Sequence, residues 1–392
     1  MVSSSCSCCS CSLIRREQVS LMDEPAPAED EWKIQGRPSL PGKLLQEFLD
    51  ACHAVGADKA LVQTGGGNIS VKVSMPVDTL GADGLGAKAG QQASLMLIKA
   101  SGTDLAEVSA SRGWSLVQQD VIGTFVHAQG DGKSSEQKPE AEYTRAIASA
   151  LMSGARPSME TGFHALLGKA IVHTHPVAIN GLLCTEEWES LVDKLYPGSC
   201  KVAFALPGLP LSLAIWRALA RFTVAGKSSP RRIFLQNHGL ICVGETLAEA
   251  VSLTQDTVKT AIDHYYDEGI TYQAPTPGLD RAFVAQSGID FTQHLFPDSV
   301  VFFPDGIGPG GRQDIALAWL AIAHLAWQVG SVHYLPADAV SSLLAMEAER
   351  FRRRQGVVAS SSALSAKADA PAGDGQKPDS KLEGTAQQED SL

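Results

Sequence analysis

The stretch Gly168-Lys-Ala-Ile-Val-His-Thr-His-Pro176 ends an apolar run with two histidines placed two residues apart. The β-branched residues before them predict a strand. Because side chains at i and i+2 of a strand point to the same face, His173 and His175 should project together. A second apolar run ends at Asn237-His238-Gly239. Three imidazole nitrogens are a ligand set of catalytic zinc with one position left open, so His238 would complete a metal site if it meets the pair.

The composition predicts a globular protein without a nucleic-acid or membrane partner. The chain has 392 residues, 44% of them hydrophobic, and a formal net charge of −11. Residues 1–31 carry −4 and residues 357–392 carry −3, which leaves about −4 for the long segment between them. That near balance gives no support for nucleic-acid binding. The longest apolar stretch, residues 315–329, is shorter than the roughly 20 residues that a membrane-spanning helix needs.

The cysteines and the termini predict a cytoplasmic protein with disordered tails. Four cysteines are scattered through apolar sequence and are expected to be buried, reduced thiols: Cys52, Cys184, Cys200 and Cys242. Four others crowd residues 6–11, where disorder is favoured over metal binding or S-acylation. The tails at 1–31 and 357–392 are rich in small and acidic residues, which favours disorder. The N-terminus lacks the apolar core of a secretory signal.

Apolar periodicity predicts one α/β domain over residues 32–275 and a C-terminal extension, residues 276–356, that packs on it. The expected helices begin near Pro41 and then cover residues 139–153, 160–167, 211–220, 246–265, 313–329 and 337–354. The expected strands cover residues 61–73 with a turn at 64–68, then 95–99, the histidine run, 233–235, 240–243 and 300–303. Loops are expected at residues 74–94 and 127–138.

Three further segments add chemistry to the histidines. Pro157-Ser158-Met159-Glu160 precedes His173 at a predicted helix start, where a hydroxyl and free backbone N–H groups favour anions. Gly-rich turns at residues 64–68 and 101–103 could present backbone N–H groups to a phosphate. Taken singly, each turn is better explained as a plain hairpin turn, so the grouping carries the functional hypothesis.

In this order the motifs resemble the class II aldolase/adducin family over roughly residues 40–270. The resemblance implies a single three-layer α/β/α domain with a central, largely antiparallel sheet. The downstream sequence resembles the longer branch that includes the aldolase part of bifunctional rhamnulose-1-phosphate aldolase/dehydrogenases, although no dinucleotide-binding part is expected here. The matching segments are Gly66-Gly-Asn-Ile-Ser70, Lys99-Ala-Ser-Gly-Thr103, Pro157-Ser-Met-Glu-Thr-Gly-Phe-His164, His173-Thr-His-Pro176, Asn237-His-Gly-Leu240, Leu295-Phe-Pro-Asp-Ser-Val-Val301, Leu335-Pro-Ala-Asp-Ala-Val340 and Met346-Glu-Ala-Glu-Arg-Phe-Arg352.

The resemblance also implies residue roles. His173, His175 and His238 would hold a divalent metal, with Zn²⁺ the expected ion, and Glu160 would be the acid/base. Family members form ring-like tetramers, so a homotetramer is expected, with a tyrosine near a subunit boundary as proton donor. Candidates for that donor are Tyr143, Tyr196, Tyr265, Tyr266, Tyr272 and Tyr334. Residues implied at the substrate phosphate are Gly67, Asn68, Ser101, Gly102 and Ser158.

The preferred reaction is aldol cleavage of a ketose 1-phosphate, a small phosphorylated sugar, to dihydroxyacetone phosphate and an aldehyde through a metal-stabilised enediolate. Family epimerases typically carry Asp where Glu160 stands, which counts against epimerisation. Related dehydratases and decarboxylases keep three histidines and an acid, so both stay open. A non-catalytic, adducin-like scaffold would be expected to lack these ligands, and their presence favours an enzyme.

Overall fold

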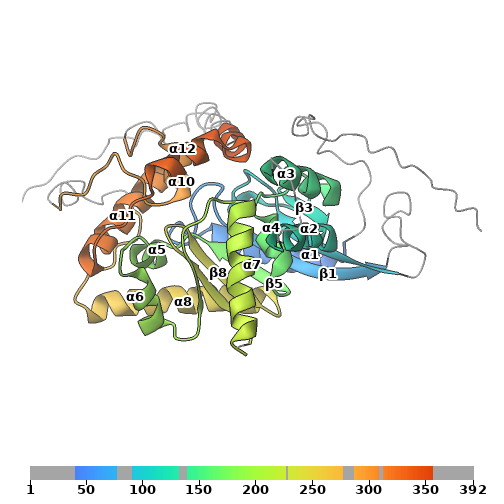
Figure 1. Ribbon diagram of the computed structural model, residues 1–392, viewed down its shortest axis with the longest axis horizontal. Coiled ribbons are helices and arrows are strands. Elements are labelled where there is room, and N and C mark those ends of the chain that lie inside the picture. Colours follow the sequence, from blue (N-terminus) through green and yellow to red (C-terminus); the bar gives the residue numbers. More distant parts are fainter. Residues whose placement is uncertain are drawn as a thin grey trace, which may run out of the picture.

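The computed structural model describes residues 40–76, 91–131, 139–226, 228–276, 287–308 and 312–355. Among them, one sheet of strand order β4-β3-β2-β1-β5-β8-β7-β6 lies between two layers of helices (Figure 1). Every neighbouring pair is antiparallel except β6 and β7, which confirms the predicted three-layer fold and its largely antiparallel sheet. The strands are β1 Asn68–Pro76, β2 Gln92–Lys99, β3 Trp114–Gln118, β4 Leu151–Gly154, β5 Ala170–Thr174, β6 Cys200–Val202, β7 Arg232–Leu235 and β8 Gly239–Gly244.

The helices cover both faces of this sheet and continue into the C-terminal extension. Residues 347–355 are helical as well. The helices with defined bounds are α1 Gly42–Gly56, the short 3₁₀ helix η3 Leu105–Glu107, α2 Gln119–Gly130, α3 Pro139–Ala150, α4 Thr161–Leu166, α5 Val177–Leu183, α6 Trp188–Leu195, α7 Leu209–Val224, α8 Leu247–Asp267, α10 Pro297–Phe302, α11 Gln313–Val329 and α12 Ala337–Ala345.

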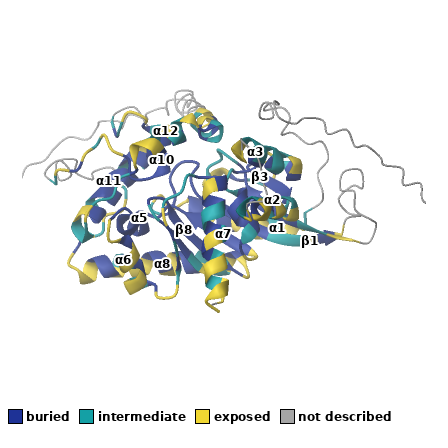
Figure 2. Cartoon of the chain, viewed as in Figure 1, coloured by how far each residue is buried: buried dark blue, intermediate teal, exposed yellow. Residues whose placement is uncertain are grey.

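Strict alternation of apolar side chains explains the three layers. In β5, Val172 belongs to the core shared with α1, α5 and α8, whereas Ile171 belongs to the core shared with α4 and α7. In β2, Leu97 faces the first of these cores and Met96 faces α2 and α3 on the opposite side. Because both faces are covered, β5 is buried along its whole length and β8 at all but one residue, whereas the far ends of β1 and β2 are partly exposed (Figure 2).

The extension shares the core of the α5 side. Trp319 of α11 is fully buried in that core, and α11 packs along α5 (Figure 1). Val300 of α10 packs with Leu343 of α12 in a smaller cluster. The predicted domain boundary at residue 275 stays a prediction. The predicted tails and the cysteine-rich segment lie outside the described residues, while the four scattered cysteines are buried and free, as expected.

Several predicted elements were wrong in type or extent. Residues 300–303 lie in or directly after the helix α10, because Pro297 starts a helix there and a short apolar run does not distinguish a buried strand from a buried helix. Residues 61–67 form turns, and β1 begins only at Asn68. The helix predicted over residues 139–153 ends at Ala150, where β4 follows immediately.

The two predicted loops and the last helix also need correction. Residues 127–130 complete α2, and residues 132–138 lie outside the described part. Of the loop predicted at 74–94, the ends belong to β1 and β2, and residues 77–90 are not described. The helix predicted over 337–354 is interrupted at Met346, where the backbone turns extended.

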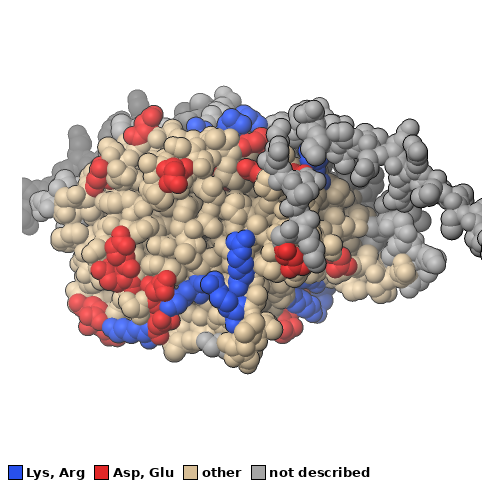
Figure 3. Space-filling view, in the orientation of Figure 1, with Lys and Arg blue, Asp and Glu red and all other residues tan. Residues whose placement is uncertain are grey.

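The described surface offers no single continuous charge field on the face in Figure 3. Lys and Arg side chains there lie beside Asp and Glu side chains. None of the helices in the described ranges is both long and apolar enough to cross a membrane.

Candidate metal centre

Strands β5 and β8 bring the three predicted histidines together. His173 is the fourth residue of β5, and His175 follows one residue after its end, so both rings lie on one side and their Nε2 atoms are 3.2 Å apart. The pairing of Thr174 with Leu240 places the turn before β8 at the same end of the sheet. His238 lies in that turn, with its ring centroid 5.1 Å from each of the other two. The three imidazoles form a buried group that could hold a metal ion.

Local backbone requirements explain the residues around His238. Asn237 adopts a left-handed conformation with φ of 50°, which Asn tolerates better than most residues. Its side-chain amide donates to the carbonyl oxygens of Leu295 and His333, both at 2.9 Å, and so ties the turn to the extension. A Cβ at Gly239 would lie 2.3 Å from the carbonyl oxygen of Thr174, so only glycine lets β8 approach β5 this closely.

The partners of the Nδ1 atoms fix the tautomers of two histidines. His173 Nδ1 lies 3.0 Å from the carbonyl oxygen of Leu240, and His175 Nδ1 lies 2.9 Å from Asp298 Oδ2. Both acceptors require Nδ1 to carry a proton, so in the neutral imidazole each Nε2 presents a lone pair. Two lone pairs 3.2 Å apart repel each other unless a cation lies between them. The donor set therefore fits a divalent metal of the zinc type.

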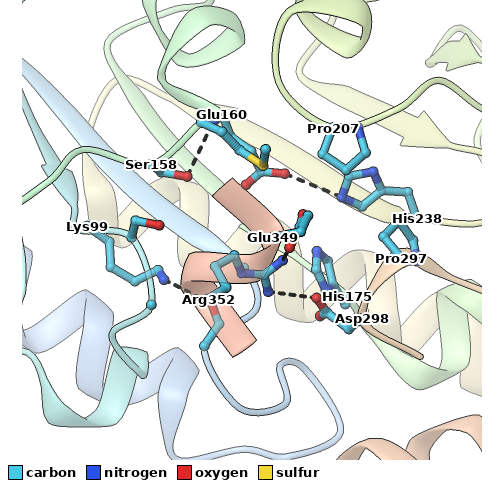
Figure 4. Close-up of a pocket in the computed structure, with 15 residues that line it drawn as sticks. Lys99, Ser158, Glu160, His175, Pro207, His238, Pro297, Asp298, Glu349 and Arg352 are labelled. Carbon is cyan, nitrogen blue, oxygen red and sulfur yellow. Dashed lines mark hydrogen bonds and ion pairs between the residues drawn. The ribbon is translucent and has the colours of Figure 1, made fainter. Parts of the chain in front are cut away.

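Glu160 completes the group from the start of α4. Its Oε1 lies 3.4 Å from Nε2 of both His173 and His238, and its side chain is 12% exposed. Figure 4 shows the contact with His238. Burial disfavours the ionised carboxylate, but the two histidines outweigh burial and hold the pKa of Glu160 well below its usual range. Burial lowers the pKa of His238 to about 4, against the opposing effect of Glu160. At neutral pH the Glu160 carboxylate is ionised and the His238 imidazole is neutral.

The predicted phosphate residues lie around the same cavity, with one exception. Ser158 and Glu160 line it together with His175 and His238. Asn68 does not line it, although it is buried and both polar atoms of its amide lack a partner among the described residues. The remaining predicted residues, Gly67, Ser101 and Gly102, are in the lining.

Sequence reasoning missed four charged residues in this lining: Lys99, Asp298, Glu349 and Arg352. Lys99 donates to the carbonyl oxygens of Gly65 at 3.1 Å and Thr103 at 2.9 Å, so it joins the two Gly-rich turns. Burial lowers the pKa of Lys99 to about 8. All four residues stand within the motif segments quoted above, but a linear motif does not show which of its charges reach the site.

None of the six candidate tyrosines, all in described ranges, lines the cavity. Tyr143 instead donates to the carbonyl oxygen of Met159 at 2.7 Å and accepts from the Gly162 amide at 2.8 Å. It supports the turn that presents Glu160. The assignment of a tyrosine proton donor stays a prediction.

A model of the Class II Aldolase and Adducin N-terminal domain matches residues 46–262. The chain belongs to this family. The uncharacterized oxidoreductase YuxG of Bacillus subtilis is 27% identical over 240 residues, which are 60% of this chain and 31% of YuxG. The chain thus spans less than a third of the length of that curated relative.

Two solved structures of class II aldolase type are similar to this chain. The N-terminal class II aldolase domain of a conserved protein from Thermoplasma acidophilum has 23% identity and a TM-score of 0.46, covering 59% of this chain and 97% of that one. A sugar-phosphate aldolase from Thermotoga maritima has 20% identity and a TM-score of 0.37, covering 58% and 96%. Within this class II aldolase/adducin chain, the matched family segment contains the three histidines and Glu160, whereas Asp298 and Arg352 lie beyond it.

Proposed function

We propose that this class II aldolase/adducin protein is a divalent-metal-dependent aldolase that cleaves a ketose 1-phosphate to dihydroxyacetone phosphate and an aldehyde. The observation that carries the proposal is the convergence of three Nε2 atoms, from His173, His175 and His238, with Glu160 Oε1 lying 3.4 Å from two of them. A scaffold has no use for a largely buried carboxylate beside three converging buried imidazoles, so this arrangement favours an enzyme.

Zn²⁺ is the expected ion, held by the three histidines, and when bound it would act as a Lewis acid on the substrate's ketone oxygen. Glu160 is the proton-transfer group of the proposal. In the direction of bond formation it takes the proton from the carbon beside the ketone, and in cleavage it returns that proton. Its position at the start of α4 fixes the carboxylate against the histidines, and the buried surroundings exclude water from that transfer.

The substrate phosphate is proposed to bind between the turns at Gly67 and Ser101-Gly102 and the start of α4 at Ser158. Gly67 and Gly102 have positive φ angles of 67° and 72°, which glycine adopts without strain, and turns of this kind can present backbone N–H groups to an anion. Lys99 holds the two turns at a fixed separation. Binding energy from the phosphate would orient the reacting carbons without involving the metal ligands.

A panel of ketose 1-phosphates tests the proposal. The purified protein is incubated with each sugar, with and without a chelator, and dihydroxyacetone phosphate is measured by a coupled reduction. We expect release from at least one sugar, its loss with chelator, and recovery after Zn²⁺ is returned. Release that persists unchanged in chelator contradicts the metal requirement.

The same panel, extended to phosphorylated sugar acids, separates the related reactions. A dehydration or decarboxylation product without dihydroxyacetone phosphate would replace the aldolase proposal with one of those activities. Absence of any bound metal and of any product would favour the non-catalytic scaffold. Light scattering tests the proposed homotetramer independently, and localisation in the cytoplasm is tested by cell fractionation.

A further inference from the structure

Of the three imidazoles, His175 is held differently from its neighbours. His173 Nδ1 donates to a neutral backbone oxygen, that of Leu240. His238 Nδ1 is buried without a partner among the described residues. His175 Nδ1 donates to a carboxylate, Asp298 Oδ2, at 2.9 Å. A carboxylate on the far nitrogen raises the basicity of an imidazole and fixes its ring plane, and such partners strongly affect metal affinity.

Asp298 is itself held in its ionised form by a third residue. Its side chain is 1% exposed, and Arg352 donates from one guanidinium nitrogen to Asp298 Oδ1 at 2.6 Å (Figure 4). Burial disfavours the charge, but Arg352 and then His175 outweigh burial and hold the pKa of Asp298 well below its usual range. The result is a continuous chain of contacts from Arg352 through Asp298 to His175, with each carboxylate oxygen used once.

The surrounding backbone is shaped to admit this chain of contacts. A Cβ built on Gly66 would lie 2.6 Å from Asp298 Oδ2 and 3.0 Å from His175 Nδ1. Any side chain at Gly66 would therefore push into the hydrogen bond itself. On the other side, Arg352 also donates to Glu349 Oε2 at 2.8 Å, which fixes the guanidinium above Asp298. Gly66 of the first Gly-rich turn thus lies against Asp298 Oδ2, while Arg352 of the helical residues 347–355 bonds Oδ1.

We propose that Asp298 and Arg352 are positioning residues for His175, so that the C-terminal extension sets the metal affinity of the site built by the family domain. Both residues lie beyond the segment that matches the family, residues 46–262. The inference rests on the proposed metal site but not on the aldol reaction. It predicts that substitutions of Asp298 or Arg352 reduce metal affinity. Arg352 bonds none of the three histidines, and its effect would reach His175 only through Asp298.

The test is a measurement of metal affinity on the full chain. Zn²⁺ dissociation constants are determined by competition with a chromophoric chelator, and Co²⁺ absorption spectra report the geometry of the site. We expect Asp298→Asn to weaken Zn²⁺ binding by about 10–100-fold and to change the Co²⁺ spectrum. We expect Arg352→Met to weaken binding in the same direction, and Arg352→Lys to recover part of the loss because it restores a cation beside Asp298.

Asp314→Asn is the matched control. Asp314 also joins the extension to the first Gly-rich turn, accepting hydrogen bonds from Thr64 N at 2.7 Å and Thr64 Oγ1 at 2.9 Å, but it bonds none of the three histidines. We expect it to lower thermal stability while leaving Zn²⁺ affinity and the Co²⁺ spectrum unchanged.

Three results would overturn the inference. Folded Asp298→Asn or Arg352→Met protein with wild-type affinity would show that His175 needs no partner from the extension, while leaving the aldolase proposal intact. An equal loss of affinity in Asp314→Asn would show a general structural effect in place of positioning. If Asp298→Asn does not fold, the order of affinities among wild type, Arg352→Lys and Arg352→Met decides. Wild-type protein that binds no metal would overturn both proposals together.

Discussion

The two halves of the site are held by different kinds of force. His173 and His238 are placed by the ladder between β5 and β8, in which Thr174 pairs with Leu240, and His173 also donates to the backbone oxygen of Leu240. The partners of His175 come instead from α10 and residues 347–355, through charged side chains. Many cooperating backbone bonds resist any single side-chain change, whereas a charged contact is lost with either partner.

The largest effect on Zn²⁺ affinity is expected in the half of the site that is held by β5 and β8. Removing His173 takes away a ligand directly, so His173→Ala should reduce Zn²⁺ affinity by more than the roughly 100-fold upper range seen for outer partners of metal ligands. Metal content after dialysis, with circular dichroism to confirm the fold, checks this. Stoichiometric zinc in folded His173→Ala protein would remove this residue from the ligand set.

A substitution of Glu160 tests whether this residue transfers the proton in the proposed reaction. Glu160→Gln keeps the size of the side chain but removes its base, so the rate of dihydroxyacetone phosphate release should fall by about 10²–10⁴-fold while bound zinc is retained. Glu347→Gln is the matched control, because Glu347 is a carboxylate of the extension that pairs with Arg156 away from the histidines. Comparable rates in the two variants would exclude Glu160 as the acid/base.

A pair of glycine substitutions sharpens the comparison without touching a charge. At Gly66 a methyl group would lie 2.6 Å from Asp298 Oδ2, whereas at Gly123, in α2, it would meet nothing within 4 Å. Gly66→Ala should weaken Zn²⁺ binding by roughly 10-fold through the displaced Asp298 contact. Gly123→Ala should leave binding unchanged and raise stability by about 0.4–1 kcal/mol. Equal Zn²⁺ affinities for both variants would contradict the close approach at Gly66.

The contrast between the halves also explains what the sequence could predict. The apolar runs before His173 and after His238 are local patterns that correctly indicated strands, and the period of two along a strand placed His173 and His175 on one face. The ordered motifs then identified the family and with it the third histidine and Glu160. The strand pattern and each family motif extend over only a few neighbouring residues, so both can be read directly from the sequence.

The extension half depends on contacts between distant segments, and local patterns do not encode these. Asp298 meets His175 across 123 positions of sequence and Arg352 across 54. The run at residues 300–303 predicted a strand, although Pro297 begins a helix there that presents Asp298 in its first turn. In the sequence, a buried functional carboxylate beside a short apolar run looks the same as a carboxylate on the solvated surface. Only the fold distinguishes these two cases.

The smallest effect is expected at the periphery of the extension, in the ion pair between Arg156 and Glu347. Two guanidinium nitrogens of Arg156 donate to the Glu347 carboxylate, one of them at 2.9 Å. The Glu347 side chain is 43% exposed, so solvent screens the pair. Glu347→Gln should therefore cost at most about 1 kcal/mol of unfolding free energy at pH 7, with Zn²⁺ affinity unchanged.

The pH dependence of that small loss identifies its source. The hydrogen bond from Arg156 lowers the pKa of Glu347 in the folded chain below its ordinary value of 4.5. A carboxylate with a lowered folded pKa stabilises the fold fully above its unfolded pKa and loses that contribution as the pH falls through the folded pKa. Urea unfolding of wild type and Glu347→Gln should thus differ at pH 7 and converge once the pH falls below the lowered folded pKa of Glu347. A difference that persists in acid would show that packing of residues 347–355, and not the charge, accounts for the loss.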